Sequence, residues 1–114
     1  MSDRLSEQLR DWGAQRDQRL QLGDNLAAPR AVDHFVFFRN KRQARSAAAA
    51  FEASGFSVTL APGMLRTTVQ ASRVDALTDA RIADLLREAI GIAEAHGGLY
   101  DGFGATIVPK SDER

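Results

Sequence analysis

The segment VDHFVFFR, residues Val32–Arg39, decides the fold of this chain. It is rich in β-branched and aromatic residues, which is typical of a β-strand. Side chains alternate between the two faces of a strand, and here both faces are apolar. The two sets are His34, Val36 and Phe38 on one face and Asp33, Phe35 and Phe37 on the other. We therefore expect this strand in the middle of a sheet, with cover on both sides.

Downstream of this strand the pattern predicts two helices and three more strands. Asn40 and Gln43 form a capping-box pattern at the start of the first helix, and Gly55 follows its end. The segment Ala61-Pro62-Gly63 predicts a hairpin turn, with Leu65 at the first inward position of the strand after it. The predicted elements are a helix at 40–54, strands at 56–60 and 64–73, a helix at 75–96 and a strand at 99–108.

Upstream of the strand, residues 3–22 predict one further helix. Ser2 can cap its start, because a serine oxygen accepts a backbone N–H bond. Leu5, Leu9 and Trp12 follow helical spacing and share one face. Residues 24–30 contain a proline and read as a linker.

The predicted order is a leading helix followed by β-α-β-β-α-β, which is the ferredoxin-like arrangement of the α+β class. It implies a four-stranded antiparallel sheet with both domain helices on one face and the first strand inside. Either the leading helix or a second copy of the chain would cover the other face. The predicted units are residues 1–30 for the helix and linker, 31–109 for the ferredoxin-like domain and 110–114 for a mobile tail.

Composition narrows the classes of function. Fifteen basic and fifteen acidic residues give a formal net charge of zero, so there is no long-range attraction to nucleic acid or to an anionic membrane. No cysteine is present, which excludes disulfides and thiolate chemistry. The charged N-terminus predicts no signal peptide, and no apolar run is long enough for a membrane span. We expect a cytoplasmic protein.

Catalytic residues are not evident. His34 lies in a strand and His96 at a helix end, and we interpret both as structural. A small isomerase or hydrolase using Asp101 and His34 is the enzymatic alternative, although no nucleophile–base set is visible. We expect no catalytic residue, no cofactor and no metal site.

Two segments are candidates for contact with a partner. The basic residues Arg39, Lys41, Arg42 and Arg45 lie around the start of a predicted helix, the unfavourable end for cations. They form either a solvated face or a site for a phosphate or an acidic partner. The segment Tyr100–Gly104 (YDGFG) surrounds Asp101 with aromatics and glycines, so Asp101 either contacts a partner or fixes a bend in the strand.

The whole chain resembles the regulator of ribonuclease E activity B family, also called the ribonuclease E inhibitor B family. The resemblance rests on His34–Phe37, on Gly55–Val58 and above all on Gly98-Leu99-Tyr100-Asp101-Gly102-Phe103-Gly104. Phe103 stands where the family usually has tryptophan. The resemblance implies a ferredoxin-like, non-enzymatic bacterial protein that binds ribonuclease E and modulates RNA degradation. Its members tend to be acidic, whereas this chain is neutral.

Three hypotheses follow. The first is a protein-binding regulator whose contact residues are Tyr100, Asp101, Phe103, Arg39 and Arg42. The second is a ferredoxin-like module for ligand binding or for forming a homodimer through its open sheet face. The third is an RNA-binding module, which the glycine- and phenylalanine-rich last strand faintly suggests, but the basic residues expected beside that strand are missing.

Overall fold

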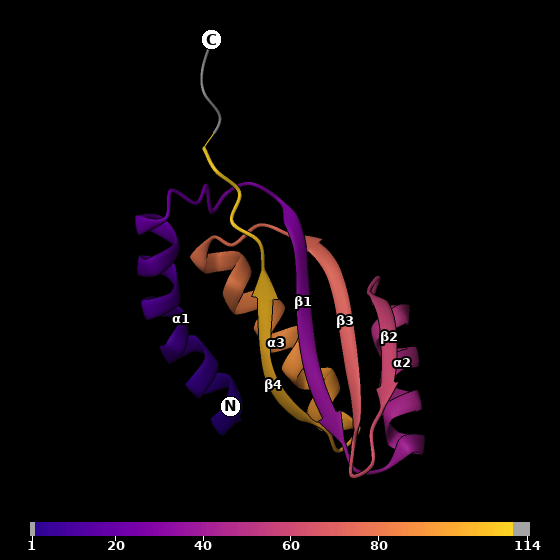
Figure 1. Cartoon of the computed structure of the whole chain (residues 1–114). Helices are drawn as coiled ribbons and strands as arrows, with labels where there is room; N and C mark the ends of the chain where they lie inside the picture. Colours follow the sequence, from indigo (N-terminus) through magenta and orange to yellow (C-terminus); the bar gives the residue numbers. More distant parts are fainter. Residues whose placement is uncertain (1, 111–114) are drawn as a thin grey trace.

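The strand predicted to organise the fold, β1 (Arg30–Phe38), lies inside a four-stranded antiparallel sheet of order β2-β3-β1-β4 (Figure 1). The computed structural model describes residues 2–110, so most of the predicted mobile tail lies outside the described residues. The α+β class and all seven element types are confirmed. The remaining elements are α1 (Asp3–Gln21), α2 (Lys41–Ala53), β2 (Ser57–Pro62), β3 (Thr67–Asp75), α3 (Asp79–Ala95) and β4 (Leu99–Ala105).

Each helix begins at a side-chain cap, and the caps Ser2 and Asn40 confirm the sequence prediction. The side-chain oxygen of Ser2 accepts the Leu5 N–H at 3.0 Å, and that of Asn40 accepts the Gln43 N–H at 3.1 Å. Thr78 caps α3, where its hydroxyl oxygen accepts the Arg81 N–H at 3.3 Å. These caps satisfy N–H groups that the first helical turn leaves without an intrahelical partner.

The β2–β3 turn is displaced from its predicted position. Ala61 and Pro62 continue β2, and the turn closes where the Gly63 N–H donates to the Arg66 carbonyl at 2.8 Å. Leu65, expected to point inward, therefore lies in the turn with 86% of its surface exposed. Pro62 is tolerated because β2 is an edge strand, where one N–H faces away from the ladder. The Pro62-Gly63 pair predicted the location of the turn correctly, but the residues assigned to the turn and the strand register after it were wrong.

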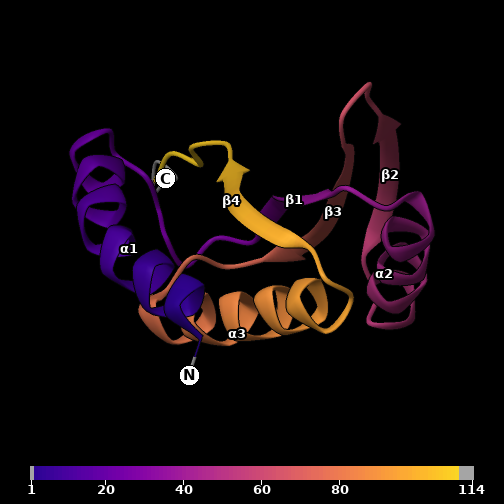
Figure 2. The same ribbon diagram turned by 90° about the horizontal axis from the view of Figure 1, so that it is seen from below.

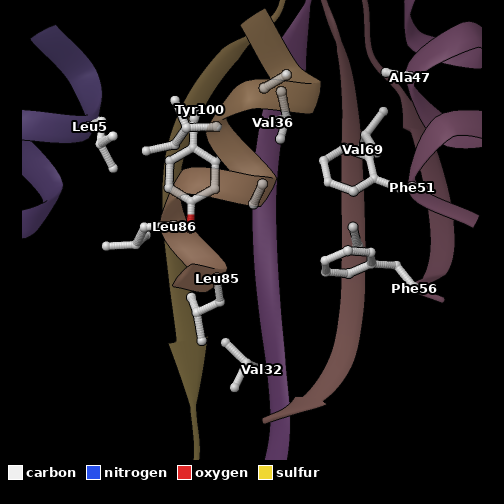
Figure 3. Packing of buried hydrophobic residues seen from close by; sticks show 14 of the residues in the cluster. Leu5, Val32, Val36, Ala47, Phe51, Phe56, Val69, Leu85, Leu86 and Tyr100 are labelled. Carbon is white, nitrogen blue, oxygen red and sulfur yellow. The ribbon is translucent and has the colours of Figure 1, made fainter. Parts of the chain in front are cut away.

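The hydrophobic core lies between the sheet and the helices α2 and α3. Figure 3 shows side chains from the sheet and from both helices meeting there, with Phe51 of α2, Leu86 of α3 and Val36 of β1 among them. The side chains of β1 alternate as predicted: the face with His34, Val36 and Phe38 is fully buried. Burial of large apolar side chains contributes about 1.5–3 kcal/mol each, so this layer dominates the stability of the fold.

The leading helix α1 does not cover the open face of the sheet, contrary to one of the two expectations. It packs on α3 and lies beside β4, on the side of the sheet that α2 and α3 occupy (Figure 2). Trp12 fixes this position, because its ring packs near Phe103 and its Nε1–H donates to Asp79 at 2.8 Å. Within residues 2–110 no helix lies over the opposite face, where Phe35 and Phe37 stay half-buried.

A buried ion pair closes the end of the sheet where β1 begins, which we call the ion-paired end (Asp24, Arg30 and Arg19). Arg30 donates to both Asp24 carboxylate oxygens at 2.7 and 2.8 Å, and Arg19 donates to the same group at 3.1 Å. Burial alone raises the pKa of Asp24, but hydrogen bonds from Arg30, the Val108 N–H and Arg19 outweigh it and lower the pKa. The predicted linker, residues 24–30, is therefore held at both ends, by the buried Asp24 and the buried Arg30.

Candidate functional site

The residues predicted to contact a partner separate into two groups in space. Arg39, Arg42 and Asp101 are exposed, whereas Phe103 is half-buried and Tyr100 is completely enclosed. Tyr100 therefore offers no surface to a partner, and its expected role as a direct contact is corrected to packing. Its ring faces the helices because it pairs with Val36 on the buried side of the sheet.

The enclosed Tyr100 hydroxyl forms a hydrogen bond with His34 Nδ1 at 2.7 Å. The other ring nitrogen of His34, Nε2, is buried with no hydrogen-bond partner among the described residues. Burial lowers the pKa of His34 to about 4, and burial, with a smaller effect of Asp101, raises the pKa of Tyr100. At neutral pH both groups are uncharged, as a buried polar pair in an apolar core requires.

Asp101 occupies a β-bulge in the YDGFG segment, residues Tyr100–Gly104. β4 pairs Tyr100 with Val36 and Gly102 with Phe35, so Asp101 is the extra residue between them. Gly102 has φ +152°, a value that favours glycine. The predicted bend in the strand is confirmed, but the expectation that Asp101 fixes it is wrong. The bend comes from the Gly102 backbone, since within residues 2–110 the Asp101 carboxylate accepts no hydrogen bond, and Asp101 itself faces solvent.

Phe103 joins the leading helix to the sheet. Its ring centroid lies 6.2 Å from that of Trp12 and 6.1 Å from that of His34. Such aromatic contacts add about 0.5–1.5 kcal/mol beyond the buried area. Phe103 is therefore mainly a packing residue with part of its ring accessible.

The exposed arginines belong to a cluster at the opposite end of the sheet from the ion-paired end. We call it the basic end; it comprises Arg39, Lys41, Arg42, Arg45 and Arg66. All five side chains are exposed, and the ion pairs found among residues 2–110 involve none of them. By contrast, Arg30 and Arg73 elsewhere are held by carboxylates. The predicted basic cluster is present, and the structure adds Arg66 to it.

A recess of about 430 Å³ opens at the basic end, between the end of β1, the start of β4 and the β2–β3 turn. The apolar residues that line it are Phe37, Phe38 and Leu99, and Arg39 and Arg66 also line it. The Arg66 guanidinium stacks on the Phe37 ring, 3.7 Å from the ring centroid. This arrangement holds a positive charge over an apolar surface.

Glycine shapes the wall of this recess. A side chain at Gly98 would place its Cβ 2.5 Å from the Phe38 ring and 2.9 Å from Val36. Gly98 therefore lets β4 approach β1 closely where the recess begins. Close packing against Phe38 and Val36 therefore explains why a glycine occupies position 98, independently of any ligand.

Sequence reasoning missed the recess and the role of Arg66 in it. The alternation in β1 did place Phe37 on the face away from the main core. The position of Arg66 depends on the register of the β2–β3 turn, which was predicted wrongly. Met64 and Leu65, 99% and 86% exposed at the tip of that turn, were missed for the same reason.

The groups required for the enzymatic alternative are not brought together. His34 is enclosed in the core, whereas Asp101 lies on the surface in the bulge. Among the described residues, no three His, Cys, Asp or Glu side chains gather in a way that could hold a metal ion. No helix within residues 2–110 has the length and apolar character to cross a bilayer.

A family model described as regulator of ribonuclease activity B matches residues 16–105 of this chain. The matched region contains the last part of α1 and every element from β1 to β4. A search of curated proteins finds no matching sequence. The match covers well over half of the chain, including the recess, the basic end and the bulge.

Proposed function

We propose that this chain, which belongs to the regulator of ribonuclease activity B family, binds ribonuclease E and inhibits it without catalysing a reaction itself. The single observation that carries this proposal is the recess at the basic end, which is lined by apolar side chains and by two arginines that form no ion pair among residues 2–110. Arginine and aromatic residues are the types that most often anchor a protein interface. The proposal includes a bacterial, cytoplasmic setting, in which the ribonuclease and its transcripts meet.

The chemistry of the recess supports binding over catalysis. Arginine stays protonated at all physiological pH values and cannot act as a general base. Among the described residues, the other polar side chain that lines the recess is Gln43, which is neutral. The groups with shifted pKa values near this part of β1 and β4 are His34 and Tyr100, and both are buried.

The ribonuclease proposal can be tested with the purified full chain and purified ribonuclease E. The rate of cleavage of a fluorogenic single-stranded RNA is measured as the chain is added. We expect the rate to fall to a saturating minimum, and a pull-down at low salt to retain the ribonuclease. An unchanged rate together with no retention would contradict the proposal. The chain alone, incubated with the same RNA, is the control for intrinsic cleavage.

A second candidate function is homodimerisation through the open sheet face. Phe35 and Phe37 on β1 favour it, because they lie half-buried with Gly102 opposite Phe35 on β4 and no helix above them within residues 2–110. Light scattering of the wild type and of Phe35→Gln would separate the two candidates. A dimer that Phe35→Gln converts to a monomer supports the second; a monomer in both cases excludes it.

We also assign the sheet domain to the ferredoxin-like arrangement. The β-α-β-β-α-β order after α1 and the two inner strands β3 and β1 support this assignment. An experimental structure with a different strand connection would refute it. The assignment matters for function because it leaves one whole sheet face free of the domain's own helices.

A further inference from the structure

The basic end carries a local surplus of positive charge. The chain is neutral overall, yet ten of its ion pairs lie elsewhere and leave this end without carboxylate partners among residues 2–110. The local surplus therefore comes from placement and not from composition. A partner that binds here gains most if it brings negative charge.

The recess adds shape to this charge. Its apolar lining can bury a side chain, and the two arginines that line it can each pair with a carboxylate. The stack on Phe37 holds the Arg66 guanidinium in place, so less conformational freedom is lost when it binds. A volume of about 430 Å³ is large enough for one bulky side chain with its flanking backbone.

The tip of the β2–β3 turn stands next to this recess in sequence and space. Met64 and Leu65 immediately precede Arg66, and both are almost fully exposed. Exposed apolar side chains of this size are commonly buried by a partner. Methionine is also well suited to adapt to a partner's surface, because it is unbranched and flexible.

We infer that the basic end binds an acidic protein segment that carries an apolar residue among its carboxylates. Its apolar side chain enters the recess, its carboxylates pair with Arg39 and Arg66, and Met64 and Leu65 pack along it. This inference rests on the proposed function, since it names the chemistry of the ribonuclease segment that the chain would bind.

Two other anionic partners fit the geometry less well. A lipid surface is flat and would leave the recess empty, although it could take up Met64 and Leu65. A single-stranded RNA running from the basic end along the open face would meet Asp33 on β1 and pass near the exposed Asp101 on β4. Both carboxylates repel phosphate. A protein segment can avoid this repulsion, because its negative charges need not be continuous.

The test uses the full chain and a fluorescein-labelled twelve-residue peptide of Asp and Glu with one central Leu. Binding is measured by fluorescence anisotropy at low and moderate salt. We expect saturable binding that weakens as salt rises, and at least a tenfold loss when Asn and Gln replace the acids. Labelled oligouridine and phosphatidylglycerol vesicles are measured in parallel, and preferential binding of either one would overturn the inference.

Variants locate the binding surface. The double substitution Arg39→Glu with Arg66→Glu is expected to weaken peptide binding at least tenfold, and Met64→Ser by a few fold. Arg10→Glu reverses one charge at another exposed arginine that has no ion pair among the described residues, on α1, and should leave binding nearly unchanged. Equal losses for both arginine sites would overturn the inference. Arg39→Gln with Arg66→Gln repeats the test if the charge reversal disturbs folding.

The outcomes also separate this inference from the proposed function. If the double variant still inhibits ribonuclease E as the wild type does, the proposed function stands and the inference fails. If the wild type neither binds nor inhibits the ribonuclease but binds the acidic peptide through Arg39 and Arg66, the inference stands and the proposed function fails.

Discussion

The two ends of the central strand β1 use arginine in opposite ways. At the ion-paired end, Arg30 is buried and donates to Asp24 and to the carbonyls of Asn25, Ala28 and Thr106. At the basic end, Arg39 is exposed and pairs with no carboxylate among residues 2–110. The same residue type therefore serves stability at Arg30, the first residue of β1, and is available for recognition at Arg39, nine positions later and just past the end of the strand.

This difference has a physical cause. A buried charge is tolerated only when a counter-charge and hydrogen bonds replace the water it loses. An exposed charge keeps its water and contributes little to folding, so it can be placed for a partner. Substitutions at the two ends should therefore separate loss of stability from loss of binding.

The largest expected effect follows from breaking the ion-paired end. Asp24→Ala leaves the buried Arg30 without its counter-charge and should lower the free energy of unfolding by about 3–5 kcal/mol. Denaturation in urea measures the change. Asp17→Ala removes an exposed partner of Arg16 and should cost less than about 1 kcal/mol. Similar losses of unfolding free energy in the two variants would show that the buried pair stabilises the fold no more than an exposed pair does.

The pH dependence of stability sharpens the comparison, because two buried groups titrate in different ranges. The neutral His34 binds its proton only near pH 4 in the folded state, but near pH 6.5 in the unfolded chain. The unfolded state thus holds more protons between these values, and stability should fall by about 3 kcal/mol as the pH drops from 6.5 to 4. Asp24, whose pKa is lowered by folding, loses its contribution only as the pH falls further.

The variant His34→Phe with Tyr100→Phe isolates the first of these effects. It removes both partners of the buried hydrogen bond, so no polar group is left alone in the core. Urea unfolding at several pH values should show a flatter profile between pH 6.5 and 4 than in the wild type. His96→Gln is the matched control, because His96 directly follows α3 and is only half-buried. A slope unchanged by the double substitution would exclude His34 as its source.

Gly98→Ala tests whether close packing supports the recess at the basic end. The added methyl group would meet the Phe38 ring, and overpacking of this kind costs about 1–3 kcal/mol. Gly104→Ala is the matched control, because nothing lies within 4 Å of its Cβ position. Thermal unfolding of both variants gives the comparison. Equal stability of Gly98→Ala and the wild type would mean that β4 can move away from β1 at little cost.

The smallest effect on stability is expected from the basic end itself. Arg39→Ala with Arg42→Ala removes two exposed cations that form no ion pair among the described residues, so the free energy of unfolding should change by less than about 0.5 kcal/mol. Urea denaturation of the double variant checks this. A loss of several kcal/mol would mean that these arginines hold the fold and are not free for a partner.

The residues of the segment 98–104, on which the family resemblance rests, have different structural roles. Gly98 allows close packing, Tyr100 binds His34 in the core, and Gly102 bends the strand at the exposed Asp101. Its residues shape the framework around the recess and line it only at their first two positions. The sequence pattern identified the segment correctly, but only the structure divides its residues between packing and exposure.

Local chemistry was enough to predict the elements of this protein. The caps Ser2 and Asn40 act within three residues of their own position, and the alternation in β1 follows from the two-residue repeat of any strand. The bulge at Asp101 was predictable for the same reason, because Gly102, whose backbone permits it, is the next residue in the chain. The β2–β3 turn failed because Pro62 is acceptable both in a turn and on an edge strand.

Only the tertiary structure decided the partners of the buried and exposed polar groups. His34 meets Tyr100 across 66 positions of sequence, and the recess joins side chains from β1, α2, the β2–β3 turn and the start of β4. The placement of α1 beside α3 depended on Trp12 reaching Asp79, 67 positions away. Such contacts depend on how whole elements pack, and the repeat of apolar residues along one element carries no information about the neighbour it will meet.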